Sequence, residues 1–156
     1  MNVLDYEVLP ILDPAADAAG RASRAVSLKN YTGMVKLVAY VNQGNAATVA
    51  LTPEQCSAVA GTGAKAIPAV PIFHAQDLAT TTVSTRATAA ASFTTSAALT
   101  AKRVEFLIDP AALDVAGGFD CVRLSTGASN AANITSAFLV AVPKHATELG
   151  ANARVD

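Results

Sequence analysis

The side chains of this sequence that could do chemistry are few, and their spacing does not bring them together. His74 and His145 are its two histidines, and neither stands at a metal-ligand spacing from a cysteine or from the other. A zinc site needs three or four ligands, so we predict no metal site. Asp109, Asp114 and Asp120 could pair for acid–base catalysis, but they flank a connector that contains proline and glycine, where aspartates usually form turns and caps.

The sequence also gives little support for nucleophilic catalysis or phosphate binding. An activated Ser, Thr or Cys needs a neighbouring base that is itself oriented, and no G-x-S-x-G motif occurs. Cys121 lies in an apolar pattern that indicates a strand. The GTGAKA segment at residues 61–66 lacks the spacing of a phosphate-binding loop and favours a turn. We therefore expect no catalytic residue and no cofactor, and we expect that the protein is not an enzyme.

The composition is rich in apolar residues and poor in charged ones. Of its 156 residues, 52% are hydrophobic and 15% are charged, and the formal net charge is −1. An average domain carries about 25% charged residues. The basic residues are scattered, which disfavours nucleic acid as a partner. No apolar run approaches the ~18 residues of a membrane span, so we expect no membrane association.

The sequence does not begin like a secretory signal, since it lacks a basic region followed by an uninterrupted apolar region. We therefore expect the protein to be made in a cytoplasm. There, two reduced and buried thiols are the usual state of cysteines such as Cys56 and Cys121. The sequence does not decide whether they form a disulfide, because that depends on the distance and orientation of the two residues.

Alternation of apolar and polar residues predicts most of the strands. It is clearest in residues 34–44 and 102–109, each of which ends at a turn signal. Residues 46–51 are expected to be the hairpin partner of 34–44. Two further strands are predicted at residues 119–127 and 133–142.

The last of these strands is apolar on nearly every residue. We expect Ile134, Phe138, Val140 and Val142 to face the core, with Leu139 and its neighbours covered by a second sheet or a second copy of the chain. A central strand buried within one subunit explains the pattern equally well.

The first segment of the chain is apolar but contains Pro10 and Pro14. Proline removes a backbone donor, so this segment cannot be a helix interior or a central strand. It is predicted to be an extended arm or an edge strand.

Two other segments depart from the strand pattern. Thr52, Pro53 and Gln55 form a capping-box signature, which predicts a short helix that ends near Gly61. Residues 79–101 are almost wholly Thr, Ala and Ser, and they are predicted to be either strand or a long loop.

The total is about seven to nine short strands and one short helix, with turn signals every ~8–12 residues. This spacing is typical of β-sandwiches and jelly rolls. We predict an all-β fold, a jelly-roll-like β-sandwich over residues 21–145. An N-terminal arm and turn precede it at residues 1–20, and a polar tail follows at 146–156.

Part of the sequence resembles a family of small proteins encoded beside the major capsid protein in tailed-bacteriophage genomes. The pattern is a Y-x-G lead into a Val-rich strand, a later V-R-L strand followed by T-G-x-x-N-A, and a final apolar strand closed by proline and a basic residue. In this sequence the pattern falls on Tyr31, Gly33, Val122 to Leu124, Thr126, Gly127, Asn130, Ala131, Pro143 and Lys144. The chain resembles the capsid cement, or decoration, proteins of short-tailed phages, including those that infect Bordetella.

This resemblance implies a structural virion protein on the outer surface of a capsid, made in the host bacterial cytoplasm. Its partners would be the major capsid protein and further copies of itself, as a dimer or trimer. It would bridge neighbouring capsid subunits and stabilise the DNA-filled head. A β-sandwich tail or receptor-recognition module that binds host glycans is the alternative function, although sugar sites usually present aromatic platforms and the chain has no Trp. A hydrolase on a β scaffold is a third possibility, because triads that form in space are invisible in a sequence.

The N-terminal arm is the favoured contact surface, since an extended apolar segment can lie across another subunit. The alternative is that it packs on its own domain. The residues predicted to contact the capsid or another subunit are Val3, Leu4, Tyr6, Leu9, Ile11 and Leu139.

Overall fold

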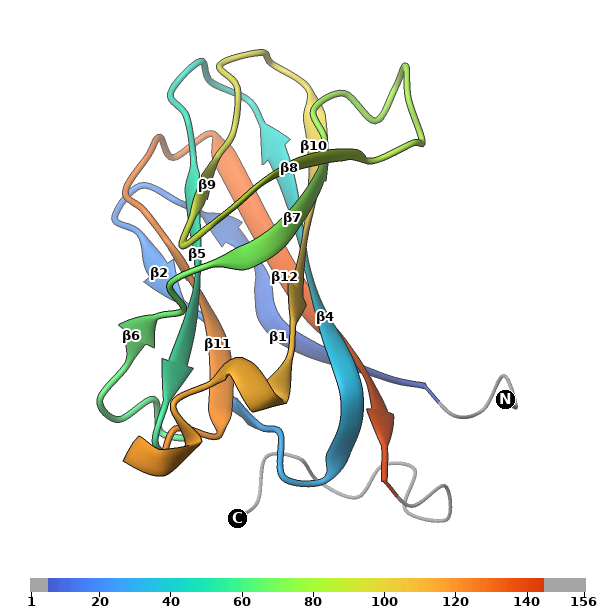
Figure 1. Cartoon of the computed structure of the whole chain (residues 1–156). Coiled ribbons are helices and arrows are strands. Elements are labelled where there is room, and N and C mark those ends of the chain that lie inside the picture. Colours follow the sequence, from blue (N-terminus) through green and yellow to red (C-terminus); the bar gives the residue numbers. More distant parts are fainter. Residues whose placement is uncertain (1–5, 145–156) are drawn as a thin grey trace.

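The computed structural model describes residues 6–144, which form two antiparallel sheets packed face to face (Figure 1). In order across the sheet, sheet A consists of β1 (Glu7–Ala16), β12 (Asn133–Pro143), β4 (Tyr31–Gln43), β10 (Ala101–Ile108), β7 (Val70–Ala75) and β8 (Thr85–Ala90). Sheet B follows the order β2 (Arg21–Ala22), β11 (Cys121–Thr126), β5 (Ala50–Cys56) and β6 (Lys65–Ala66), with β3 (Val26–Ser27) paired to β11 and β9 (Phe93–Thr94) paired to β5. Two 3₁₀ turns, η2 (Pro110–Ala112) and η3 (Val115–Gly117), lie between β10 and β11. The prediction of an all-β sandwich is confirmed.

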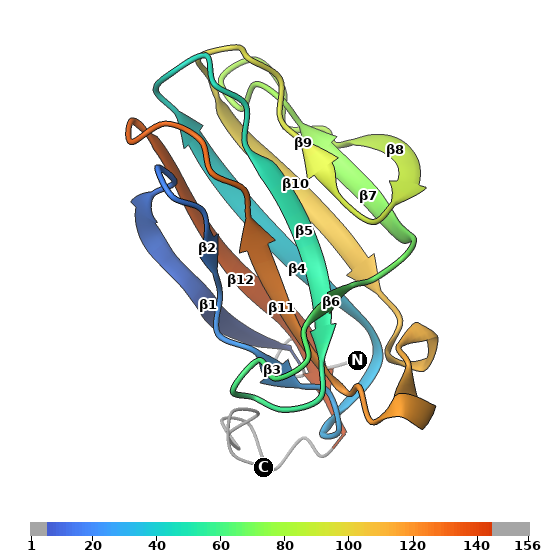
Figure 2. The same cartoon turned by 90° about the vertical axis from the view of Figure 1, so that its left-hand side faces the viewer.

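The core fills the space between the two sheets, which lie one in front of the other in Figure 2. Leu37 and Phe106 from sheet A and Leu51 and Leu124 from sheet B are completely buried there. Three alanines on β4 and β12 are also buried. Small side chains at these positions allow the layers to approach closely, so an alanine-rich chain can still reach native packing density.

The strongest alternating patterns became the long central strands of sheet A. Residues 102–108 lie in β10, where Val104, Phe106 and Ile108 are buried, and residues 34–43 lie in β4. These two strands pair along the whole of β10, from Ala101 opposite Asn42 to Ile108 opposite Val35. Both predictions are confirmed, because alternation with one apolar face belongs to a half-buried strand.

The short helix predicted from Thr52, Pro53 and Gln55 is wrong, since these residues lie in β5. On one side, β5 pairs with β11 from Leu51 to Cys56. On its other side, β5 pairs with β9 at its start and with β6 near its end, and Pro53 falls between these two ladders. Proline is tolerated in that gap because no backbone donor is required there. The capping signature is local, and pairing with β11 outweighs it.

The predicted hairpin of residues 34–44 with 46–51 is also wrong. β4 belongs to sheet A and β5 to sheet B, so the chain crosses from one layer to the other between Gln43 and Ala50. Consecutive strands that both bury an apolar face can satisfy it by facing each other across the core as well as by pairing edge to edge.

The N-terminal segment is an edge strand from Glu7 onward. β1 pairs with β12, with register shifts after Pro10 and after Leu12. Leu9, Ile11 and Leu12 point into the core. Of the two alternatives left open for this segment, the edge strand is therefore the one that forms.

β12 presents the opposite face to the core from the one predicted. Thr135, Ala137, Leu139 and Ala141 are buried, whereas the four residues expected inside lie on the outer surface of sheet A, half-buried or exposed. Apolarity could not decide this orientation, because both faces of the strand are apolar. The small side chains on the inward face let sheet B approach closely. Thr135, on the same face, donates a hydrogen bond to the buried carboxylate of Asp17.

The Thr/Ala/Ser tract of residues 79–101 combines the two structures that the sequence left open. It contains β8, the far edge strand of sheet A, and the short β9, which crosses to sheet B and pairs with β5. The remaining residues are turns and loops.

A buried carboxylate joins the two sheets where β1 leads into β2. Asp17 is fully buried. Its Oδ1 accepts hydrogen bonds from Thr126 Oγ1 of sheet B at 3.2 Å and from the Arg21 guanidinium at 3.1 Å. Its Oδ2 accepts a hydrogen bond from Thr135 Oγ1 of sheet A. One charged group therefore connects β11, β12 and the turn into β2.

Candidate binding surface

The outer face of sheet A, turned away from sheet B, is mostly apolar over its first three strands. Val8 lies opposite Val140, and Pro10 lies opposite Phe138, which in turn lies opposite Val38. We define the apolar face as these outward residues of β1, β12 and β4: Val8, Pro10, Ile134, Phe138, Val140, Val142, Met34, Val38 and Tyr40. Every strand of residues 6–144 belongs to one of the two sheets, so within these residues no third layer of strands covers this face.

Several large side chains of the apolar face are open to solvent. Val8 is 59% exposed, Met34 52%, and Tyr40 and Ile134 38% each. The rings of Tyr40 and Phe138 stack with their centroids 5.9 Å apart, which fixes the centre of the face. Soluble monomers seldom expose a continuous apolar patch larger than a few hundred Å², and larger ones usually mark a contact with another molecule.

The charged residues within and beside the apolar face are paired with one another. Lys36 lies inside the face, opposite Val140, and its Nζ is 3.0 Å from Glu105 Oε2 on the neighbouring β10. Arg103 Nε lies 2.8 Å from Glu105 Oε1, and Arg103 also donates to Ser84 Oγ at 2.9 Å. A partner can therefore cover the face without burying an unpaired ion.

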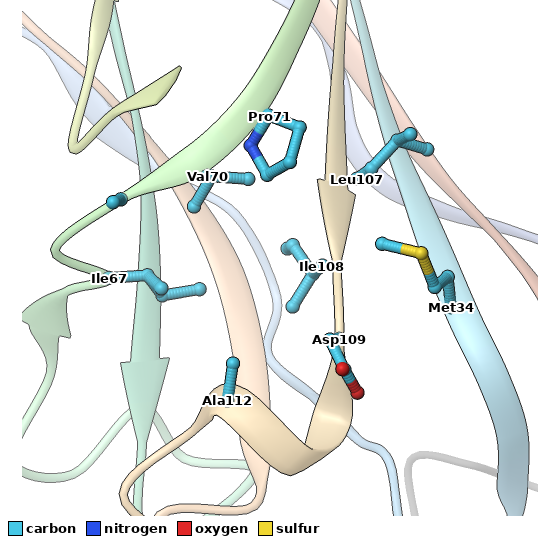
Figure 3. A pocket seen from close by; sticks show the side chains of 9 residues that line it. Met34, Ile67, Val70, Pro71, Leu107, Ile108, Asp109 and Ala112 are labelled. Atoms are coloured by element: carbon cyan, nitrogen blue, oxygen red, sulfur yellow. The ribbon is translucent and has the colours of Figure 1, made fainter.

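A cavity of about 120 Å³ opens beside the apolar face, where β7 and β10 diverge (Figure 3). These two strands pair from Arg103 to Phe106 of β10, and the ladder ends there. Beyond it, Met34, Pro71 and Leu107 line the cavity from the outer side, and η2 closes its end. An apolar pocket next to a flat apolar surface is suited to an anchoring side chain of a partner.

The free edge of β1 is closed to strand addition over much of its length. Arg21 donates from Nη1 to the Asp13 carbonyl at 2.9 Å and from Nη2 to the Ala15 carbonyl at 2.8 Å. Arg24 Nη1 donates to the Pro10 carbonyl at 3.2 Å. Occupied carbonyls and prolines are devices that protect an edge strand from pairing with another chain.

The other edge of sheet A has no such protection within residues 6–144. β8 pairs with β7 on one side, and its opposite side faces away from the sheet. Its side chains are small apart from Arg86, and most are exposed. Such an edge is a template for a strand of another molecule.

The structure separates the residues that the sequence predicted as an interface. Leu9, Ile11 and Leu139 are 7%, 2% and 0% exposed and belong to the core, so they are not available to a partner. Tyr6 is 49% exposed at the start of the described chain. Val3 and Leu4 lie outside the described residues.

The residues of the apolar face were not identified from the sequence. The sequence did contain an indication, because residues 134–142 are apolar at almost every position. A strand that buries only one face needs apolar residues at only every second position. The remaining apolar residues of this strand lie on the outer surface.

The aspartates considered for catalysis serve the turns between β10 and β11, as expected. Asp109 caps η2 and Asp114 caps η3, each by accepting a hydrogen bond from a backbone N–H. A hydrogen bond from Lys65 Nζ at 2.7 Å, together with the bond from the Gly117 N–H, lowers the pKa of Asp114. Asp120 pairs with Lys29 at 3.1 Å.

His74 stacks on Phe93 with the ring centroids 4.8 Å apart. His145 lies outside the described residues. Among residues 6–144, no group of three or more His, Cys, Asp or Glu side chains is placed to hold a metal ion. No helix in this part of the chain has the length and apolarity needed to cross a membrane.

Comparison with known proteins gives a likeness of fold. No family model matches the chain, and no curated protein matches its sequence. Among solved structures, it is similar to the SPBc2 prophage-derived protein YomS, with 9% sequence identity and a TM-score of 0.51. The alignment covers 88% of this chain and 93% of that one. At such low identity the similarity concerns the fold.

Proposed function

We propose that this protein is a structural virion protein that binds the outer surface of a bacteriophage capsid and bridges neighbouring major capsid subunits. The observation that carries the proposal is the apolar face, which no other strand layer of residues 6–144 covers and which is backed by a six-stranded sheet. The proposed location is the exterior of the virion. The proposed partner is the major capsid protein.

Two further observations support a phage setting. The sequence carries the motif pattern that resembles capsid cement proteins, from Tyr31 to Lys144. The fold is similar to that of a protein described as prophage-derived.

A cement role follows from elementary energetics. Packaged DNA presses the shell outward, and a protein that spans two subunits must lose its buried contact area before they separate. A typical specific interface removes about 800 Å² from each partner. Each copy need contribute only a few kcal/mol, because many copies act in parallel and linked copies bind with higher avidity.

We further propose that two copies pair through β8. Antiparallel pairing centred between Ala87 and Thr88 would place Arg86 of one copy opposite Ala89 of the other, so the two like charges would not meet. The protection of β1 by Arg21 and Arg24 leaves β8 as the edge suited to self-association.

Self-association is tested by sedimentation equilibrium of the wild type with two matched variants. In Ala89→Arg, the new arginine of each copy lies opposite Arg86 of the other copy, so two pairs of like charges meet. This variant is expected to weaken the dimer roughly tenfold. Ala89→Glu sets opposite charges there and is expected to strengthen it. A monomeric wild type, or a dimer that ignores both changes, contradicts pairing through β8.

Capsid binding is tested by mixing the protein with purified capsids that lack it. We expect the protein to co-sediment up to a saturating number of copies and to raise the temperature at which the heads break. A glycan-array signal without retention on capsids would instead favour a receptor-recognition module and would refute the cement role.

A further inference from the structure

We propose that Cys56 and Cys121 are an oxidisable pair, which closes to a disulfide between β5 and β11 within one chain. The two residues are direct partners at the end of the antiparallel ladder between these strands. Neither is in a disulfide in this structure, and both are 0% exposed. Sixty-odd residues separate them in sequence, so their juxtaposition is a product of the fold alone.

Backbone geometry at this position already suits a disulfide. Directly opposed residues of an antiparallel pair have Cα atoms about 4.5 or 5.5 Å apart, depending on the type of pair. Disulfides span Cα distances of about 4.4–6.8 Å. Opposed side chains also project from the same face of the sheet, so closure requires side-chain rotation and little movement of the strands.

The surroundings make the thiols difficult to reach. The cysteines form a small cluster with Ala25, packed against Val59 and Ala64 and separate from the main core. Desolvation by burial raises the pKa of the Cys56 thiol. Cys121 Sγ donates a hydrogen bond to Asp120 Oδ1 at 3.1 Å. At neutral pH Cys56 therefore stays largely protonated and reacts slowly.

Hydrogen peroxide is an oxidant small enough to enter such a cluster. One cysteine, as the thiolate, attacks a peroxide oxygen, forms a sulfenic acid and releases hydroxide. The second thiolate then attacks the sulfenic sulfur, forms the S–S bond and expels a second hydroxide. The two hydroxides take up the two thiol protons, so two thiols and one peroxide give one disulfide and two waters.

The disulfide would join the two central strands of sheet B at one end of their ladder and would close a long loop of the chain. Constraining a loop of this length in the unfolded state is expected to raise the midpoint of thermal unfolding by about 10 °C. Because the thiolate is the nucleophile, the rate of closure is expected to rise about tenfold per pH unit below the pKa of Cys56. The inference does not depend on capsid binding.

The test exposes the folded, reduced wild type to hydrogen peroxide and follows intact mass, free thiols and thermal unfolding. We expect a monomer lighter by two hydrogens, a peptide linking Cys56 to Cys121, and the higher midpoint, all reversed by dithiothreitol. Cys56→Ala and Cys121→Ala, which add no polar group to the cluster, should gain neither the link nor the shift. Oxidation of the wild type to sulfinic acid, links between chains, or thiols that persist until the protein unfolds would each overturn the proposal.

Discussion

Replacing both Val8 and Met34 by glutamate is expected to weaken retention on capsids by more than roughly a hundredfold. These side chains lie on the two flanks of the apolar face and are 59% and 52% exposed, so the substitutions leave the core intact. Fully burying a large apolar side chain contributes about 1.5–3 kcal/mol, and these two are already about half buried, so the two losses come to roughly 1.5–3 kcal/mol. The cost of covering two unpaired carboxylates adds to this. Titration of capsids with each protein, followed by sedimentation, measures the difference.

The matched control for this variant is Leu99→Glu with Val115→Glu. These residues are 64% and 59% exposed, but they lie in the loop before β10 and in η3, away from the apolar face. The control carries the same added charge and should bind like the wild type. Equal loss in both double variants would mean that charge alone controls retention, and no loss in either would place the contact elsewhere.

Removing the Asp17 carboxylate is expected to cost about 3–5 kcal/mol of the free energy of unfolding. In Asp17→Ala the Arg21 guanidinium loses its ion-pair partner, and the hydroxyls of Thr126 and Thr135 lose a shared acceptor inside the protein. Domains of this size are stable by about 5–15 kcal/mol, so the variant should unfold at a much lower urea concentration.

Asp13→Ala is the control for this prediction. Asp13 also pairs with an arginine, Arg24, at 2.7 Å, but its side chain is 72% exposed. Exposed ion pairs contribute about 1 kcal/mol or less, so its urea midpoint should stay close to that of the wild type. Similar midpoints for the two variants would mean that burial of Asp17 does not determine its contribution.

The sequence predicted the central strands well because their information is local. In β10, alternation of Val104, Phe106 and Ile108 with polar neighbours specifies both a strand and its buried face. The class of fold followed from several such patterns and the turns between them. The prolines of the first segment likewise restricted it to an edge or an arm.

The errors arose where pairing between distant segments decides the structure. The capping signature at Thr52 is a sound local motif, yet those residues pair with β11, about seventy positions further along. Nothing near β4 indicates that the next strand joins the other sheet. Such contacts depend on the whole topology, which a local pattern does not contain.

The candidate surface could be predicted only in part, for the same reason. Excess apolarity in β12 indicated a partner layer, but the strand has two apolar faces, and the choice between them depends on how closely sheet B approaches the alanines at 137 and 141. Leu139 was expected on the face away from the core, under a second sheet or a second copy, and it lies in the core between the two sheets. Val8 and Met34 came to the surface through the register of β1 and β4 against neighbouring strands.

A density map of capsids saturated with the protein, compared with bare capsids at a resolution that separates the two sheets, tests the central claim most directly. Adhesion through the apolar face predicts that sheet A lies against the shell across a boundary between capsid subunits, with β1, β12 and β4 nearest to it and sheet B outermost. Added density in which sheet B meets the shell, or the lack of any added density, would contradict the account.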